Sequence, residues 1–261
     1  MTIPVVTLNN GVTMPQLGFG TWRVGRDAVA EALRTGYRCI DTAEMYRNET
    51  DVAAALAGSG LERAEVFVTT KVWNDHHGHR ATLEAFHASR RRLGLDVVDL
   101  YLVHWPSASD SVNVDTWRAL ESLHADGLVR AIGVSNFSPA QLDVLLDACD
   151  VVPAVNQIEL HPARPRLEER AYHERHGIAT QAWAPLARAA VLTHPVVTAV
   201  AAAHGRTPAQ VVLRWHLQHG VIAIPRSASP ERIRENFAIA DFSLTPQDMA
   251  ALDSLGGRTA P

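Results

Sequence analysis

The sequence predicts an α/β protein built as a single-domain (β/α)8 barrel, the TIM-barrel fold, with an N-terminal β-hairpin. From Leu17 onward, short apolar runs of the β type alternate with helical patterns, and no linker or low-complexity stretch interrupts the series. Strands that alternate with helices are typical of parallel sheets, and eight such units can close a barrel. The length of 261 residues fits one barrel, so we expect a single domain over residues 1–261.

Each expected element depends on a local pattern. The hairpin is predicted from the apolar runs 5–8 and 12–14, because the Asn9-Asn10-Gly11 segment between them suits the positive φ of a tight turn. The runs predicted as strands are 17–19, 37–40, 66–70, 98–103, 130–134, 154–157, 178–182 and 221–224. Helical patterns cover 27–35, 49–58, 80–93, 115–126, 139–148, 167–176 and 207–218.

The composition is that of an ordinary globular protein, with 47% hydrophobic and 20% charged residues. A net charge of −4 argues against a nucleic-acid partner, which would require a basic face. No apolar run approaches the roughly 20 residues that span a bilayer, and the first residues lack the pattern of a secretory signal. Cys39 and Cys149 follow no repeated spacing and are expected to be reduced thiols. We therefore expect a cytoplasmic monomer with no membrane partner.

Lys71 is the only lysine in the chain, and every other basic side chain of this type is arginine. It lies at the end of the predicted strand 66–70, where an unpaired ammonium would be costly to remove from water. Lysine is a compact point charge with an adjustable pKa, whereas arginine is a planar fork that stays protonated. The retention of one amine at this position indicates a chemical requirement, although chance retention would leave the same pattern.

Polar side chains follow three successive predicted strands. Asp41 and Tyr46 come after strand 37–40, Lys71 after 66–70 and His104 after 98–103. Functional groups of barrel enzymes lie at these carboxyl ends, so the four residues are expected to form an acid–base set. A cation about 4 Å from a phenol could lower its pKa by up to roughly 3 units. Each residue taken singly also fits a structural role.

Three tryptophans, Trp22, Trp73 and Trp105, lie just beyond predicted strands and could wall a pocket for an uncharged organic substrate, or simply pack the barrel rim. The segment 74–79 holds three histidines, but no opposed second cluster accompanies it, so we expect a solvated loop and no metal site. Gly18, Gly20 and Gly25 do not have the spacing of a dinucleotide-binding fingerprint. The only lysine does not fit a P-loop either.

Five segments together resemble the aldo-keto reductases, and they are 41–46 (DTAEMY), 69–73 (TTKVW), 102–106 (LVHWP), 133–137 (GVSNF) and 155–162 (VNQIELHP). The resemblance extends in order over nearly the whole chain. Segments 73–75 and 207–217 are most similar to the bacterial branch that contains the 2,5-diketo-D-gluconate reductases.

The resemblance implies an NADPH-dependent reductase of small-molecule carbonyls, aldehydes or ketones that include keto-sugars and keto-acids. Asp41, Tyr46, Lys71 and His104 match the catalytic tetrad of the family, with Tyr46 as proton donor. The matching cofactor contacts fall into three groups. Ser135, Asn136 and Gln157 match the groups that bind the nicotinamide carboxamide, and Trp183 matches the ring that stacks on the nicotinamide. The remaining contacts, at the 2′-phosphate, the adenine and elsewhere along the cofactor, are Thr21, Leu186, Arg226, Ser227, Arg232, Glu235 and Asn236.

Three features depart from the family pattern. Arg226 stands where most relatives have lysine, so NADPH preference should survive with altered affinity. The loop 186–189 lacks the usual glycines, which puts the clamp over the pyrophosphate in doubt. The sequence also ends soon after Gly257, so we expect an open and permissive site.

Other functions remain open from the residues alone. A lysine at a strand end in a barrel could form a Schiff base with a carbonyl, as in a lyase. A metal hydrolase using His104 and His161, and a nucleotide-sensing module without activity, are further alternatives.

Overall fold

The computed structural model describes residues 3–257 and confirms the predicted barrel with its N-terminal hairpin. The strands β1 (Val5–Thr7) and β2 (Thr13–Pro15) pair in antiparallel fashion around the Asn-Gly turn. Parallel strands then follow one another around the barrel in chain order. They are β3 (Phe19–Gly20), β4 (Cys39–Asp41), β5 (Phe67–Val72), β6 (Val98–Val103), β7 (Val129–Ser135), β8 (Val155–Glu159), β9 (Ala179–Trp183) and β10 (Ile222–Ala223).

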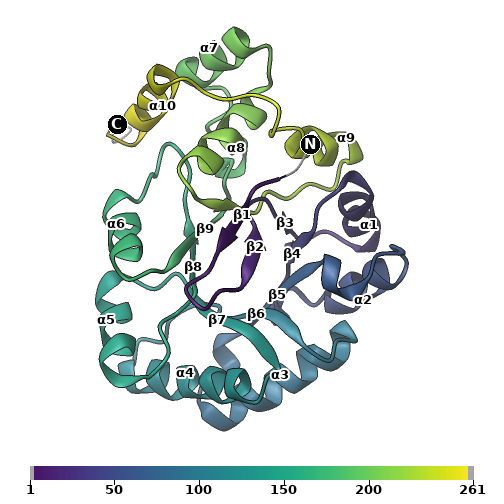
Figure 1. Ribbon diagram of the computed structural model, residues 1–261, viewed down its shortest axis with the longest axis vertical. Helices are drawn as coiled ribbons and strands as arrows, with labels where there is room; N and C mark the ends of the chain where they lie inside the picture. The colour runs from purple at the N-terminus through teal and green to yellow at the C-terminus, as the bar shows by residue number, and fades with distance from the viewer. Residues whose placement is uncertain (1–2, 258–261) are drawn as a thin grey trace.

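Backbone contacts between the first and last barrel strands close the sheet. Leu17 forms a parallel bridge with Ala223, and the N–H of Gly18 donates to the carbonyl of Ala223 at 2.9 Å. The N–H of Gly20 donates in the same way to Pro225 at 3.0 Å. All barrel strands therefore run in one direction and end on the same face (Figure 1).

The helices surround the strands, as Figure 1 shows. The predicted helices occur as α1 (Arg26–Thr35), α2 (Glu49–Ala57), α3 (His79–Leu93), α4 (Asp110–Ala125), α5 (Pro139–Ala148), α6 (Leu167–Arg175) and α8 (Pro208–Gln218). Of these, α4 begins at Asp110 rather than at residue 115.

Three further helices were not predicted, and they are α7 (Pro195–His204), α9 (Pro230–Phe237) and α10 (Pro246–Asp253). Each begins with proline after a capping side chain, from His194, Ser229 or Thr245, that accepts a backbone N–H of the first turn. Proline is favourable at a first helical position because that N–H would be unpaired anyway. The pairs His194-Pro195, Ser229-Pro230 and Thr245-Pro246 therefore indicate where these helices begin.

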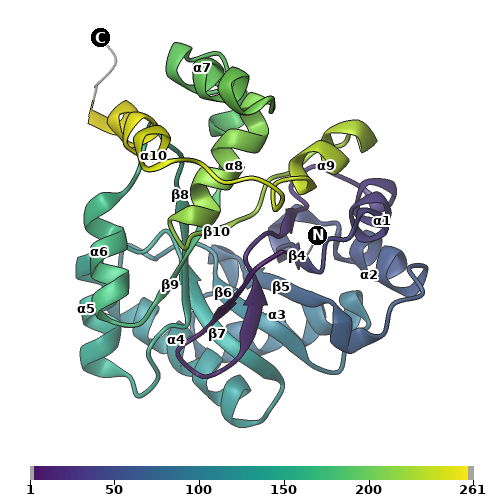
Figure 2. The ribbon, with the colours of Figure 1, turned by 45° about the horizontal axis from the view of Figure 1, so that its top comes forward.

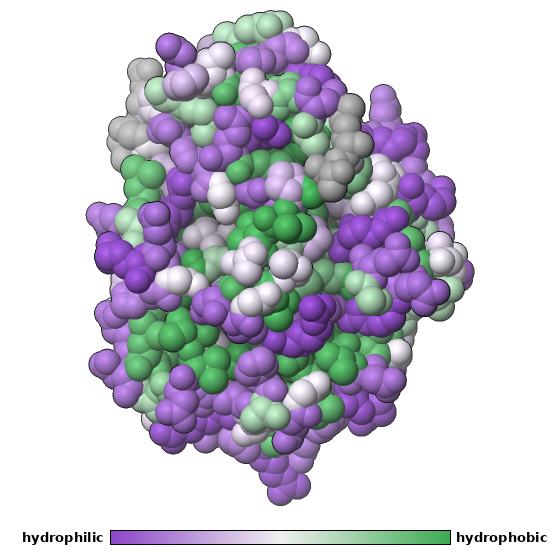
Figure 3. All heavy atoms as spheres, viewed as in Figure 1, coloured by the Kyte–Doolittle hydropathy of each residue, from purple (hydrophilic) through white to green (hydrophobic). Residues whose placement is uncertain are grey.

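The hairpin covers the amino-terminal end of the barrel (Figures 1 and 2). Leu8 and Met14 pack in one buried cluster with Phe67 and Val155, which begin their strands and point inward. On this face, Figure 3 shows apolar patches interspersed among polar side chains. The hairpin thus leaves the carboxyl ends of the strands as the face on which a site can form. None of the helices in residues 3–257 has the length and apolar character needed to span a lipid bilayer.

Candidate active site

Lys71 forms a buried ion pair inside the barrel. It is the penultimate residue of β5, its exposed fraction is 0%, and its Nζ lies 2.6 Å from Oδ1 of Asp41. The ammonium also donates to the carbonyl of Thr42 at 2.8 Å. Burial lowers the pKa of Lys71, but the neighbouring Asp41 and Tyr46 raise it by more, so the net shift is upward. The amine therefore carries its charge at neutral pH.

Tyr46 ends the short 3₁₀ helix η1 (Glu44–Tyr46) that follows β4, and Lys71 Nζ lies 5.1 Å from its ring centre. Burial raises the pKa of the Tyr46 phenol, and the lowering effect of Lys71 is smaller, so the net shift is upward. The expectation of a lowered pKa was wrong in sign. The expected lowering was calculated from the attraction between Lys71 and the phenolate. In the folded chain, the desolvation of the phenol has the larger effect on the pKa.

His104 lies directly after β6 and contacts two aromatic rings. Its imidazole centre is 5.6 Å from that of Tyr46 and 5.1 Å from that of Trp73. Burial, followed by the charge of Lys71, lowers the pKa of His104 to about 2. The imidazole is therefore neutral at physiological pH. Its Nδ1 is buried without a hydrogen-bond partner among the described residues.

The three tryptophans each contact another aromatic ring. Trp22 packs on Tyr46 at 5.0 Å between ring centres, while Trp73 packs on His104. Trp105, which is 41% exposed, lies 6.4 Å from Trp183 instead. A cavity of about 210 Å³ adjoins Trp105, Asn136 and Trp183. Trp22 and Trp73 thus contact members of the predicted tetrad, whereas Trp105 lines the cavity.

Three residues expected to bind the nicotinamide carboxamide form one network at the ends of β7 and β8, in which Gln157 takes part through its backbone carbonyl. Ser135 and Gln157 are paired across the two strands, and the Ser135 hydroxyl donates to the Gln157 carbonyl at 2.8 Å. The amide of Asn136 donates to the His104 carbonyl at 3.1 Å and to Ser135 Oγ at 2.9 Å. Its Oδ1 accepts the indole N–H of Trp183 at 2.8 Å. The hydrogens of Asn136 are therefore already in use within the protein.

Gln157 joins this network to the buried ion pair. Its Nε2 donates to Asp41 Oδ2 at 2.7 Å and to Oε1 of Gln181 at 2.7 Å. Sequence reasoning missed Gln181. Its spacing from Trp183 could have indicated it. Residues i and i+2 of a strand share a face, and Gln181 precedes Trp183 by two positions.

The residues expected near the 2′-phosphate lie around the start of α9. The hydroxyl of Ser227 accepts the Ser229 N–H at 3.0 Å, and the hydroxyl of Ser229 caps the helix. Arg226 and Arg232 are exposed, and neither guanidinium pairs with a carboxylate in residues 3–257. Two unpaired cations beside a helix N-terminus suit an anion. In the same helix Asn236 is buried and Glu235 is half-buried.

The other two expected cofactor residues are partly committed to the fold. Thr21 is buried, and its hydroxyl donates to the Asp41 carbonyl at 3.0 Å. Leu186 is half-buried and packs between two core clusters. It precedes a left-handed turn in which Ala187, Arg188 and Ala189 have φ values of 49°, 52° and 75°. Such φ values strain residues other than glycine, so this loop adopts a strained conformation.

The histidine-rich loop has contacts of its own. His76 Nδ1 lies 2.9 Å from Glu44 Oε1, and His79 Nε2 lies 3.4 Å from the Ser122 hydroxyl. Within residues 3–257, no group of three His, Cys, Asp or Glu side chains is arranged to hold a metal ion.

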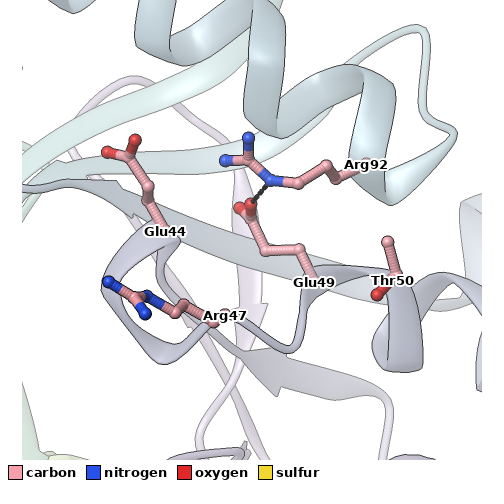
Figure 4. Close-up of a pocket in the computed structure, with 5 residues that line it drawn as sticks. All are labelled: Glu44, Arg47, Glu49, Thr50 and Arg92. Atoms are coloured by element: carbon pink, nitrogen blue, oxygen red, sulfur yellow. Dashed lines mark hydrogen bonds and ion pairs between the residues drawn. The ribbon is translucent and has the colours of Figure 1, made fainter.

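A second cavity, of about 300 Å³, lies beside the turn that carries Tyr46 (Figure 4). Glu49 in its wall is buried, accepts the Thr70 hydroxyl at 2.6 Å and pairs with Arg92 at 2.7 Å. Glu44 and Arg47, which lie on either side of Tyr46 in the sequence, line the same cavity. These contacts tie the segment after Tyr46 to β5 and α3.

The fold and this centre define a parallel barrel with a buried cluster of titratable side chains at the carboxyl ends of its strands. The sequence matches the model of the Aldo/keto reductase family over residues 16–256. An aldo-keto reductase of Mycobacterium sp. (strain KMS) is 51% identical, over 100% of this chain and 97% of that protein. The glyoxal reductase of Bacillus subtilis (strain 168) is 47% identical, over 96% and 92% of the two chains.

A solved structure gives the same result in three dimensions. A Gox0644 variant in complex with NADPH superimposes with a TM-score of 0.94 at 43% identity, over 100% of this chain and 97% of that one. This chain belongs to the aldo/keto reductase family, and it is an oxidoreductase of the kind that uses NAD(P)H.

Proposed function

We propose that the protein reduces aldehyde or ketone carbonyls of small molecules with NADPH, with Tyr46 as the proton donor. The observation that supports this most directly is the buried Lys71–Asp41 pair beside Tyr46 and His104. Bound at this face, the nicotinamide would supply the hydride. The chain itself would hold the carbonyl, supply the proton and exclude water.

The electrostatics fit a proton donor. Because its pKa is raised, the Tyr46 phenol keeps its proton at neutral pH. When the proton leaves, the charged Lys71 stabilises the phenolate, and Asp41 keeps the ammonium in place. The neutral imidazole of His104 can donate a hydrogen bond that orients the substrate oxygen.

The same electrostatics disfavour a Schiff-base lyase. An amine attacks a carbonyl only when it is unprotonated, and Asp41 and Tyr46 keep Lys71 protonated. Sodium borohydride with a carbonyl substrate should therefore leave Lys71 unmodified. A trapped adduct on Lys71 would support the lyase instead.

For the cofactor, we infer a preference for NADPH over NADH. Arg226 and Arg232, beside the α9 N-terminus, have guanidinium groups without a carboxylate partner in residues 3–257, and only NADPH carries the extra phosphate. Arg226→Ala and Arg232→Ala should weaken NADPH binding much more than NADH binding. Arg80→Ala, on the exposed face of α3, is the matched control. Equal losses for the two cofactors would place the phosphate elsewhere.

For the substrate, we infer small carbonyl compounds, which include keto-sugars, keto-acids and dicarbonyls. Trp22 and Trp73 offer apolar walls beside Tyr46 and His104, and one relative is named a glyoxal reductase. We further propose that the enzyme acts as a cytoplasmic monomer. A screen of NADPH oxidation over aldehydes, keto-acids and keto-sugars would identify the preferred class.

The decisive variant is Tyr46→Phe. It should lower the rate of aldehyde reduction by about 10²–10⁴-fold or more, because proton transfer and the hydrogen bond to the oxyanion are both lost. NADPH binding, measured by fluorescence, should be nearly unchanged. Tyr172→Phe, which removes a buried phenol of helix α6 bonded to Asp143, is the matched control. Full activity of Tyr46→Phe would exclude Tyr46 as the acid.

A further inference from the structure

The donor and acceptor chemistry of three buried side chains, Asp41, Gln157 and Gln181, fixes the orientation of the Gln157 amide. The Asp41 carboxylate only accepts, so the amide of Gln157 must turn its NH2 group towards it, at 2.7 Å. The second hydrogen of that NH2 then points to Gln181, 2.7 Å away on the paired position of β9. Two amide nitrogens cannot bond to each other, so Gln181 must present its oxygen.

Both hydrogens of Gln157 are therefore used inside the barrel. Its Oε1 accepts no hydrogen bond from the described residues, and it is not among their fully buried unpartnered atoms. Towards a ligand above the strand ends, Gln157 can therefore offer an acceptor and no donor.

We propose that Gln181 is a positioning residue that, together with Asp41, fixes Gln157 as an acceptor for the NH2 group of the nicotinamide carboxamide. This inference rests on the proposed function, because it takes nicotinamide as the ligand of Gln157. Gln181 acts through Gln157 and does not itself reach the cofactor. If its oxygen were lost, one N–H of Gln157 would be released and could turn to the carboxamide oxygen.

The environment of Gln181 supports a role beyond packing. Its exposed fraction is 0%, and its Nε2 has no partner in the part of the chain that the structure describes. A buried donor without a partner is unfavourable, and an apolar side chain of similar size would avoid that cost. Among residues 3–257, the Oε1 of Gln181 accepts one hydrogen bond, from the Gln157 amide.

The test compares two cofactors that differ in one hydrogen-bond donor. The reduced 3-acetylpyridine analogue of NADPH has a methyl ketone in place of the carboxamide, so it keeps the carbonyl oxygen and lacks the NH2 group. The wild-type protein should bind NADPH on the order of tenfold more tightly than the analogue. Gln181→Met keeps the side-chain length without an oxygen acceptor. In this variant the ratio of the two dissociation constants should fall to about one or two.

Gln181→Glu is the matched rescue, because a carboxyl group keeps an oxygen acceptor for Gln157 in either protonation state. It should restore most of the preference for NADPH. Adenosine 2′,5′-bisphosphate, which lacks nicotinamide, should bind all three proteins equally, and this control also reports that the variants are folded.

Several results would overturn the proposal. These are a wild-type protein without the preference, a Gln181→Met variant that keeps it, and a loss of it in both variants. The first of these is measured on the wild type and does not depend on how the variants fold. Failure of the proposed function is distinct, because it would appear as absence of NADPH oxidation with every carbonyl substrate while cofactor binding is still measurable.

Discussion

Replacing Lys71 with methionine should destabilise the protein as well as inactivate it. The side chain of Lys71 is fully buried, and its loss leaves the Asp41 carboxylate without its cation, which lies at 2.6 Å. Breaking a buried pair from one side typically costs about 3–5 kcal/mol. Gln157 continues to donate to Asp41 Oδ2, so we expect the lower end, about 3 kcal/mol. In a domain of this size that corresponds to a fall in Tm of roughly 6–12 °C.

The assay is thermal and chemical denaturation of three variants. Lys71→Met should melt well below the wild type, and Lys71→Met combined with Asp41→Asn should recover much of the loss, because the stranded charge is removed. Asp41→Asn alone shows the cost of the other half of the pair. Neither variant that lacks Lys71 should regain activity. A Lys71→Met protein as stable as the wild type would refute the argument from the buried carboxylate. A double variant no more stable than Lys71→Met alone would refute it as well.

Three further predictions concern the cation at residue 71, the stability at acid pH and the backbone strain at residue 189. Lys71→Arg should lower kcat by about 10²-fold, because a guanidinium cannot occupy the place of an ammonium held at 2.6 Å and 2.8 Å without shifting Asp41 or Tyr46; near-native turnover would mean that charge alone suffices. The pKa of His173 is lowered to about 4, mainly by burial. Since the unfolded state binds that proton first, the free energy of unfolding should fall by roughly 3 kcal/mol as the pH drops from about 6.5 to about 4. Urea denaturation should show a shallower fall with pH in His173→Asn than in the wild type. Parallel falls in the two proteins would contradict the assignment to His173. Ala189→Gly should raise stability by about 1 kcal/mol, because Ala189 has a φ of 75°, whereas Ala199→Gly within α7 should lower it; a Tm change of the same sign in both would rule out relief of strain.

The sequence predicted those features that depend on periodicity and on strand ends. Parallel strands end on one face, so Asp41, Lys71 and His104 could be brought together from their places in the chain. The direction of the Tyr46 pKa shift could not be predicted, because it depends on how much water the folded site excludes. Contacts between distant positions, such as Gln157 with Asp41, required the closed barrel.

Other differences come from weak local signals. Helix α7 is rich in alanine and valine on all sides, so it lacks a clear amphipathic stripe. The left-handed turn at residues 187–189 contradicts the preferences of alanine and arginine. A local preference of this kind is overridden only by the surrounding structure, so no reading of the loop alone could have found it.

The single lysine makes this protein suitable for isotope labelling. Because Lys71 supplies the only ε-amine of the sequence, growth on ¹⁵N-lysine yields a single side-chain Nζ resonance, with no assignment needed. That resonance would report the charge of the ammonium between Asp41 and Tyr46 at each pH and with each ligand. It also follows that amine-directed coupling reagents find no exposed lysine on the surface, since Lys71 is fully buried. Immobilisation or fluorescent tagging through lysine would therefore require an engineered one.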